Sequence, residues 1–162
     1  MSLIRRATLT PFLWFNGQAE EAAHFYCSIF PDSTLGGTTR WGKGGRGPEG
    51  IAITVEFTLG GQSFTALNGG PQYTFTEAIS FSIACQTQAE IDYYWDRLTS
   101  AGGTPSRCGW LKDRFGLSWQ VVPANLGALI NAPNNTAAVM AALMPMSKIE
   151  LAPLEAAARR ST

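Results

Sequence analysis

The sequence predicts an α+β protein made of two tandem βαβββ modules, which form a cupped, mixed β-sheet, followed by C-terminal helices. Three observations predict this fold class. Apolar residues alternate along short segments, as they do in half-buried strands. A helical period interrupts this alternation once in each half of the chain. The same order of elements then recurs at an offset of 70 residues.

The first module is expected over residues 8–70. The turn signal Asn16-Gly17 ends its first strand, Pro31-Asp32 stops its helix, and Gly60-Gly61 joins its last two strands into a hairpin. The expected elements are a strand at 9–15, a helix at 18–30 and strands near 34–41, 51–59 and 62–68.

The second module is expected over residues 76–124. Thr87 is a candidate N-cap for its helix, in which Ile91, Trp95 and Leu98 form an apolar stripe. The expected elements are a strand at 78–85, this helix, and short strands near 104–111 and 116–122. An alanine-rich helical extension follows at 125–160, with helical pieces around 123–130, 134–144 and 148–158.

Residue matches between the halves indicate duplication. Gln18-Ala19-Glu20 corresponds to Gln88-Ala89-Glu90, and Thr10 corresponds to Ser80. A repeated supersecondary unit usually means that one unit cannot bury its apolar face alone. We therefore expect residues 1–162 to form a single domain of two copied modules.

Composition restricts the partners. Apolar residues make up 45% of the chain and charged residues 15%, and the net charge is zero, so no basic field favours nucleic acid. No apolar window is long enough to cross a membrane. The three cysteines form no Cys-x-x-Cys pair, which favours reduced thiols and a cytoplasmic location. The near-neutral charge is compatible with an oligomer.

Several segments together resemble a known family. They are residues 10–26 (TPFLWFNGQAEEAAHFY), 29–33 (IFPDS), 65–71 (TALNGGP), 77–81 (EAISF) and 108–123 (CGWLKDRFGLSWQVVP). The chain resembles the PhnB-like family of the glyoxalase, bleomycin-resistance and extradiol-dioxygenase (vicinal oxygen chelate) superfamily, whose members often carry a name taken from 3-demethylubiquinone-9 3-methyltransferase. The resemblance implies the paired βαβββ fold, a homodimer and a concave pocket for a small organic molecule.

The resemblance also implies where a metal would bind. Catalytic members of the superfamily take His, Glu or Gln ligands from the first and last strands of each module. The corresponding positions here are Thr10, a residue near Asn68, Ser80 and Gln120, and only Gln120 belongs to that ligand set. Hydroxyls and amides bind hard cations weakly. The only histidine, His24, is expected on the surface of the first helix. We therefore expect no metal and no cofactor.

Strand alternation places candidate pocket residues on the concave face. They are Thr10, Phe12, Trp14, Asn68, Ser80, Ser82, Ser118 and Gln120, with Trp110 and Asp113 on a loop at the pocket entrance. This mixture of aromatic, hydroxyl and amide groups is typical of small-molecule pockets. Two alternatives stay open: Phe12 and Trp14 could instead serve dimer packing, and Asp113 is equally a turn former.

Glu56 is the candidate catalytic residue, because it is a carboxylate in the middle of an apolar strand. In a water-poor cup it could act as a general acid or base. The alternative is an exposed strand face, or an ion pair with Arg40 or Arg114.

Two classes of function follow from these residues. The first is a small-molecule-binding protein without the usual metal. The second is an enzyme, which would use either a metal held by Gln120, Glu56 and water or metal-free acid–base chemistry at Glu56. A third reading is a structural or regulatory protein whose pocket is vestigial. The methyltransferase name finds no support, since the strand–glycine-loop–helix opening of a cofactor-dependent methyltransferase is missing.

Overall fold

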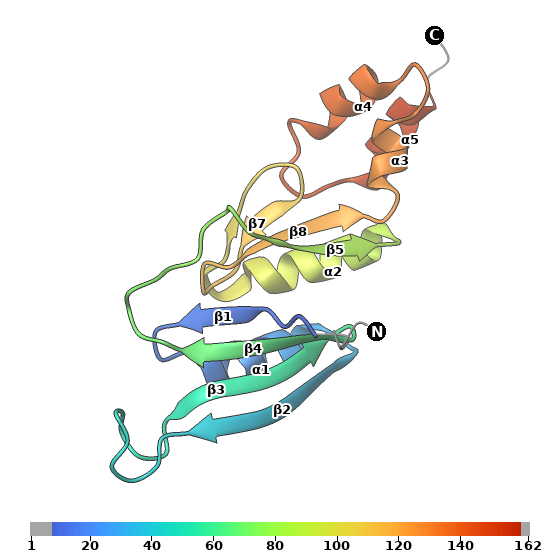
Figure 1. Ribbon diagram of the computed structural model, residues 1–162. Helices are drawn as coiled ribbons and strands as arrows, with labels where there is room; N and C mark the ends of the chain where they lie inside the picture. Colours follow the sequence, from blue (N-terminus) through green and yellow to red (C-terminus); the bar gives the residue numbers. More distant parts are fainter. Residues whose placement is uncertain (1–7, 160–162) are drawn as a thin grey trace, which may run out of the picture. The chain divides into compact units, whose positions relative to one another are not determined.

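The computed structural model describes residues 8–159, and its contacts divide the chain into two compact units, Met1–Thr74 and Phe75–Thr162. Each unit contains one four-stranded mixed sheet and one helix packed on it (Figure 1). The predicted α+β fold of two tandem modules is confirmed. Within residues 8–159, no helix is long and apolar enough to cross a membrane.

The first unit follows the predicted βαβββ order. Its elements are β1 (Phe12–Phe15), α1 (Ala19–Ile29), β2 (Ser33–Arg40), β3 (Ala52–Leu59) and β4 (Gln62–Asn68). The strand order in the sheet is β1-β4-β3-β2. β1 runs parallel to β4, and the other neighbours are antiparallel. The connection from β1 to its parallel partner therefore includes α1, as parallel strands require a crossover.

α1 covers one face of this sheet. The rings of Tyr26 and Phe57 stack with centroids 6.0 Å apart, and Phe57 stacks on Phe64 at 5.4 Å. All three side chains are buried, and each contributes about 1.5–3 kcal/mol through its burial. Side chains alternate along a strand, so the immediate neighbours of Phe57 and Phe64 in β3 and β4 lie on the opposite, open face of the sheet.

A β-bulge interrupts the pairing of β2 with β3. Leu35 pairs with Phe57 and Thr38 with Val55, so Gly36 and Gly37 together face the single residue Glu56. A second register shift follows between Thr39 and Arg40. The regular alternation predicted for 51–59 therefore holds from Val55 to Leu59 but not at its start.

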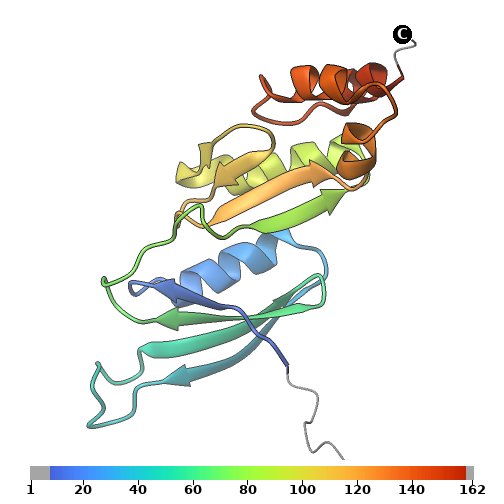
Figure 2. The same ribbon diagram turned by 45° about the horizontal axis from the view of Figure 1, so that its top comes forward.

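The second unit repeats this topology and adds the extension. Its module contains β5 (Phe81–Cys85), α2 (Gln88–Thr99), a 3₁₀ turn at Ser100–Gly102, β6 (Thr104–Pro105), β7 (Trp110–Lys112) and β8 (Ser118–Pro123). The sheet order is β5-β8-β7-β6, the same as in the first unit. α2 lies along one face of this sheet (Figure 2).

Two predictions for this unit have clear outcomes. Thr87 is the N-cap of α2, and its hydroxyl accepts a hydrogen bond from the Glu90 N–H at 3.2 Å. The short strands predicted near 104–111 are β6 and β7. Cys108 and Gly109 separate them with positive φ angles of 55° and 83°, which a regular strand does not accommodate.

The two sheets correspond residue by residue. Leu13 of β1 pairs with Ala66 of β4, and its counterpart Ile83 of β5 pairs with Val121 of β8. The β4 residue that corresponds to Gln120 is therefore Thr65, because Phe12 pairs with Thr65 and Ser82 with Gln120. The sequence-based assignment near Asn68 was three positions too far along β4.

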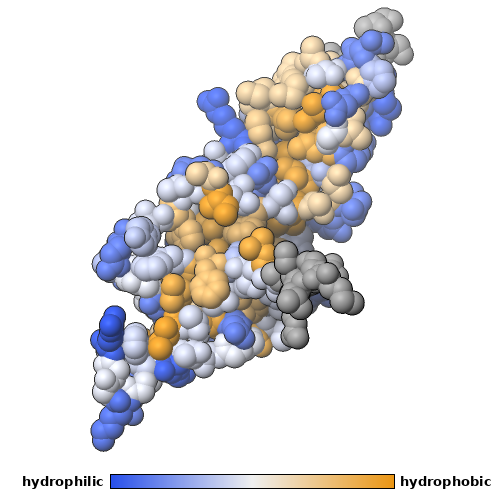
Figure 3. All heavy atoms as spheres, viewed as in Figure 1, coloured by the Kyte–Doolittle hydropathy of each residue, from blue (hydrophilic) through white to orange (hydrophobic). Residues whose placement is uncertain are grey.

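The C-terminal extension contains α3 (Leu126–Ile130), α4 (Thr136–Leu143) and α5 (Leu151–Ala158). The side chain of Gln88, at the start of α2, bonds to the chain around the start of α5. Its Nε2 donates to the Ile149 carbonyl at 3.0 Å, and its Oε1 accepts from the Leu151 N–H at 2.8 Å. On the side shown in Figure 3, weakly to strongly hydrophobic surface predominates over these helices between hydrophilic edges.

Candidate functional site

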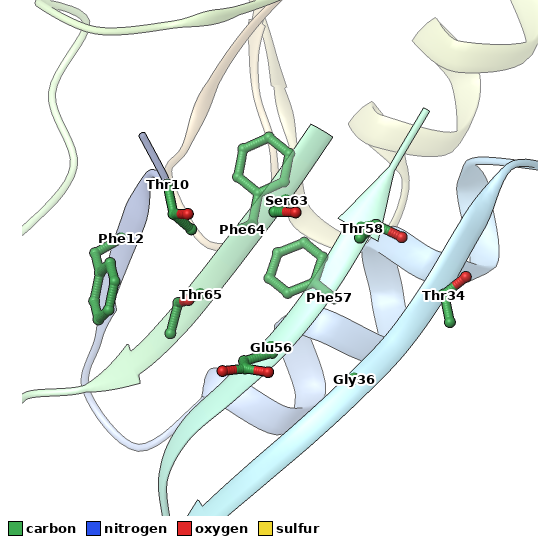
Figure 4. A pocket seen from close by; sticks show the side chains of 10 residues that line it. All are labelled: Thr10, Phe12, Thr34, Gly36, Glu56, Phe57, Thr58, Ser63, Phe64 and Thr65. Atoms are coloured by element: carbon green, nitrogen blue, oxygen red, sulfur yellow. The ribbon is translucent and has the colours of Figure 1, made fainter. Parts of the chain in front are cut away.

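The open face of the first sheet contains a pocket of about 460 Å³. Residues from all four strands and from the segment before β1 line it (Figure 4): Thr10, Phe12, Thr34, Gly36, Glu56, Phe57, Thr58, Ser63, Phe64 and Thr65. Five of these residues carry hydroxyl groups, one carries a carboxylate and Phe12 adds an exposed ring. Such a lining offers hydrogen bonds and apolar contacts to a small molecule.

Glu56 lies in the middle of this pocket. It pairs with Thr65 across β3 and β4, and its side chain points to the open face (Figure 4). Among residues 8–159, Glu56 makes no hydrogen bond or ion pair. Arg40, one of its two expected partners, instead pairs with Glu20. The carboxylate is therefore available to a ligand.

The glycine bulge provides space beside Glu56. A β-carbon at Gly36 would lie 3.0 Å from the Glu56 β-carbon, and one at Gly37 would lie 3.4 Å from the Glu56 Oε2. Gly36 has an ordinary φ, so the requirement for glycine there comes from space and not from backbone conformation. The pair Gly36-Gly37 inside a strand was the sequence signal for this feature.

The structure brings together only some of the predicted residues of the first module. Thr10 and Phe12 line the pocket, and Phe12 is 62% exposed. Trp14 is not among the lining residues: its indole N–H donates to the Gly70 carbonyl at 2.8 Å, and its ring meets Tyr73 edge-on at 4.9 Å. Its packing partner is thus the segment that follows β4.

Asn68 is also not among the lining residues, and its side chain bonds to backbone groups instead. Its side-chain oxygen accepts from the Ala19 N–H at 2.9 Å, and its side-chain nitrogen donates to the Ala52 carbonyl at 3.0 Å. The residue therefore links β4 to the start of α1 and to β3. Both of its polar atoms are occupied within the first unit.

The open face of the second sheet has a pocket of its own, with a volume of about 490 Å³. Two of the predicted pocket residues, Trp110 and Ser118, line it. Lys112 and Glu77 line it as well. Gln120 lies on the same face as Trp110, with which it pairs, but its side-chain nitrogen donates to the Ser80 hydroxyl at 2.9 Å. Ser82, the strand partner of Gln120, is exposed.

Asp113 is buried away from this pocket, with 3% of its surface exposed. One carboxylate oxygen accepts from the Phe115 N–H at 2.8 Å and the Leu117 N–H at 3.1 Å, and the other accepts from the Trp119 indole at 2.8 Å. These contacts close the turn between β7 and β8, in line with the turn-forming alternative.

The four positions at which the sequence resemblance places metal ligands present weak donors. Thr10, Thr65 and Ser80 offer hydroxyls, and Gln120 offers an amide already bonded to Ser80. Across residues 8–159, no three His, Cys, Asp or Glu side chains gather into a metal-binding group. His24 is exposed on α1. This donor set does not fit a divalent ion.

Comparison with known proteins identifies the family. The family described as 3-demethylubiquinone-9 3-methyltransferase matches residues 7–122. A solved structure described as a putative 3-demethylubiquinone-9 3-methyltransferase, PhnB protein, from Bacillus cereus is 36% identical. The match covers 73% of this chain and 100% of that chain, with a TM-score of 0.67.

Other comparisons extend to the fold. Protein PA1353 from Pseudomonas aeruginosa is 22% identical over 70% of this chain and 95% of that chain, with a TM-score of 0.57, and so shares the fold. No curated protein matches this chain. The family match covers both modules, and the PhnB-like resemblance of the sequence is confirmed. The chain belongs to the family described as 3-demethylubiquinone-9 3-methyltransferase.

Proposed function

We propose that this chain is a small-molecule-binding protein, and that the pocket of the first module holds a small, partly aromatic ligand. One observation carries the proposal: Glu56, without a partner among residues 8–159, lies in a hydroxyl-lined pocket beside a glycine bulge that leaves it uncovered. A carboxylate accepts strong, charge-assisted hydrogen bonds from N–H and O–H donors. The ligand would direct such a donor at Glu56.

The remaining lining defines the rest of the ligand. Phe12 offers a ring for an apolar or aromatic group, and Thr10, Ser63 and Thr65 offer hydroxyls that can donate or accept. The pocket volume of about 460 Å³ lies within the range of small-molecule sites. The donor set at the metal-equivalent positions supports binding without a divalent ion.

The methyltransferase description of the family does not transfer to this chain as an activity. A cofactor-dependent methyltransferase of the doubly wound type needs a strand, a glycine-rich loop and a helix in succession. The glycine-rich segment 42–50 lies instead between two antiparallel strands, β2 and β3. Binding is therefore the function that these residues support best.

The test uses benzylamine, which combines a ring with a cationic donor, and its neutral analogue benzyl alcohol. We expect chemical-shift changes around Glu56 in NMR titrations of the full chain. Glu56→Gln should weaken benzylamine binding by about ten-fold and benzyl alcohol binding less, since only the amine forms a charged pair. Phe12→Ala should weaken both.

The oligomeric state provides the control for Phe12. If light scattering shows that Phe12→Ala dissociates a homodimer while probe binding is unchanged, Phe12 serves packing between copies. Equal binding of both probes to the wild-type protein, the Glu56→Gln variant and the Phe12→Ala variant would refute the proposal for this pocket.

Acid–base catalysis at Glu56 is the second candidate function, and the same observation favours it. A carboxylate without a protein partner can take a proton from a bound ligand if the ligand's C–H lies within reach. This function predicts deuterium exchange next to the carbonyl of acetophenone in heavy water. Exchange that is equally fast with the Glu56→Gln variant would exclude Glu56 as the base.

A further inference from the structure

The open face of the second module differs in charge from that of the first, although the two faces correspond. Thr58 pairs with Ser63 in the first sheet, and Lys112 pairs with Ser118 at the equivalent place in the second. Glu56 pairs with Thr65, and its counterpart Trp110 pairs with Gln120. The duplicated face therefore carries a lysine and an indole where the first carries a threonine and a carboxylate.

Lys112 already binds a carboxylate. Its Nζ lies 2.6 Å from the Glu77 Oε1, and the two side chains are 40% and 63% exposed. The hydrogen bond from Lys112 lowers the pKa of Glu77 below its usual value. Glu77 belongs to the segment before β5, outside any helix or strand. The contact shows that Lys112 binds a carboxylate group at this pocket.

Ser118 provides a second polar group. The residue is 1% exposed, and its hydroxyl has no hydrogen-bond partner within the described part of the chain. A buried hydroxyl without a partner is unfavourable, and a hydroxyl can rotate toward an acceptor. Ser118 lines the same pocket as Lys112 and lies directly across from it on β8.

Trp110 completes the pocket. It lies two residues before Lys112 on β7, so both side chains project from the same face of the sheet, while Leu111 between them is buried. An indole offers a broad ring surface to a planar group. The volume of about 490 Å³ is sufficient for a single-ring molecule.

We propose that this pocket is a separate site for a small aromatic carboxylate, and that Glu77 occupies the position of the ligand's carboxylate when the site is free. On binding, the ligand carboxylate replaces that of Glu77 at Lys112, the Ser118 hydroxyl rotates to donate to it, and the ring lies against Trp110. Glu77 thus competes with the ligand from within the chain.

Residues of the second unit alone form this site, so it does not depend on the function proposed for the first module. At the position of Lys112 the first module has Thr58, which carries no charge. An anionic ligand should therefore prefer the second module, and a cationic one the first. Benzoate is the probe that separates the two.

Substitutions on the two sides of the ion pair have opposite expected effects. In calorimetric titrations of the full chain with benzoate, Lys112→Gln should weaken binding by about ten-fold, because it removes the cation. Glu77→Gln should strengthen binding by about two- to five-fold, because it removes the internal competitor. Exposed ion pairs contribute little to stability, so both variants should fold.

Two matched controls isolate the site. Lys148 is the other ion-paired lysine of this unit, with its Nζ 2.8 Å from Asp92, and Lys148→Gln should leave benzoate binding unchanged. Benzamide, which keeps the ring but has no charge, should bind more weakly than benzoate and should not respond to Glu77→Gln. Ser118→Ala should weaken benzoate binding by about three-fold.

Three outcomes would overturn the proposal. The wild-type protein and the Glu77→Gln variant could both fail to bind benzoate. Lys112→Gln and Lys148→Gln could change benzoate affinity equally, or Glu77→Gln could bind benzoate more weakly than the wild-type protein does. A change in benzoate affinity caused by Glu56→Gln would assign the anion to the first module and would also overturn the proposal. A failed benzylamine test with a successful benzoate test would refute only the function proposed for the first module.

Discussion

Gly36 lies so close to Glu56 that a β-carbon on the glycine would be 3.0 Å from the Glu56 β-carbon and 3.1 Å from its carbonyl oxygen. Gly36→Ala should therefore push the bulge away from β3. We expect a loss of roughly 1–3 kcal/mol in the free energy of unfolding, measured by urea denaturation. Benzylamine binding should weaken in the same variant, because the methyl group reaches the pocket beside the carboxylate.

Gly42→Ala is the matched control. Nothing lies within 4 Å of the β-carbon that this substitution would add, and Gly42 has an ordinary φ. Its stability should equal or slightly exceed that of the wild-type protein, because alanine restricts the unfolded chain more than glycine does. If Gly36→Ala and Gly42→Ala unfold at the same urea concentration, the bulge does not need its glycine.

Asn68 should prove important for stability rather than for binding. Asn68→Ala removes both side-chain bonds and leaves the Ala19 N–H and the Ala52 carbonyl without their partner. We expect a loss of about 1–3 kcal/mol in the free energy of unfolding, since both groups are part-buried. Benzylamine affinity should stay unchanged in the folded variant.

Asn68→Asp tests the helix side of this contact separately. Aspartate keeps an acceptor for the Ala19 N–H and places a negative charge at the start of α1, which the helix dipole favours. It loses the donor to Ala52, and its second oxygen would face the Ala52 carbonyl oxygen, acceptor against acceptor. Its stability should lie between those of the wild-type protein and Asn68→Ala, and a value below that of Asn68→Ala would contradict this account.

The fold could be predicted because its signals are local. Turn glycines, the change of period at α1 and α2, and the internal repeat each occupy a few neighbouring residues, and together they give the order of elements. Alternation along β1 also identified Phe12 as a residue of the open face. These features require no knowledge of which strands pair.

The site could be predicted only in part, because strand register is a tertiary property. Thr65 lines the pocket, but choosing it over Asn68 requires knowing that β4 pairs with β1 at Phe12. A polar residue at the end of a strand has the same sequence pattern whether it faces a ligand or a backbone N–H. The carboxamide of Asn68 and the carboxylate of Asp113 bind backbone N–H groups, and no local pattern distinguishes the two cases.

Asp113 should be the more sensitive of these two positions. Asp113→Ala would leave two backbone N–H groups and the Trp119 indole N–H without their acceptor at a buried site. We expect a loss of roughly 3 kcal/mol or more in the free energy of unfolding, since hydrogen bonds to a charged group contribute more than neutral ones. Thermal denaturation followed by circular dichroism measures this loss.

Asp113→Asn separates the turn from the indole contact. The asparagine oxygen can still accept from the Phe115 and Leu117 N–H groups, but its NH₂ group would face the Trp119 N–H, donor against donor. Its stability should lie between those of the wild-type protein and Asp113→Ala. An Asp113→Ala variant as stable as the wild-type protein would show that the turn forms without the carboxylate.

Cys85 should make stability depend on pH in the alkaline range. Burial, with a smaller contribution from the nearby Glu90 carboxylate, raises the pKa of the Cys85 thiol from 9.0 to about 11. Between these values the folded protein keeps the proton that the unfolded chain has lost. The free energy of unfolding should therefore fall as the pH rises from 9 toward 11, by up to ~1.4 kcal/mol per pH unit.

Comparing the wild-type protein with Cys85→Ala isolates this contribution. The cavity left by the substitution lowers stability at every pH, but it does not titrate, and other ionisable groups such as Cys27 are common to both proteins. Urea denaturation at pH 8.5 and at pH 10.5 should show the stability advantage of the wild-type protein shrinking with rising pH. An advantage that stays constant would mean that the Cys85 thiol ionises equally readily in the folded and unfolded states.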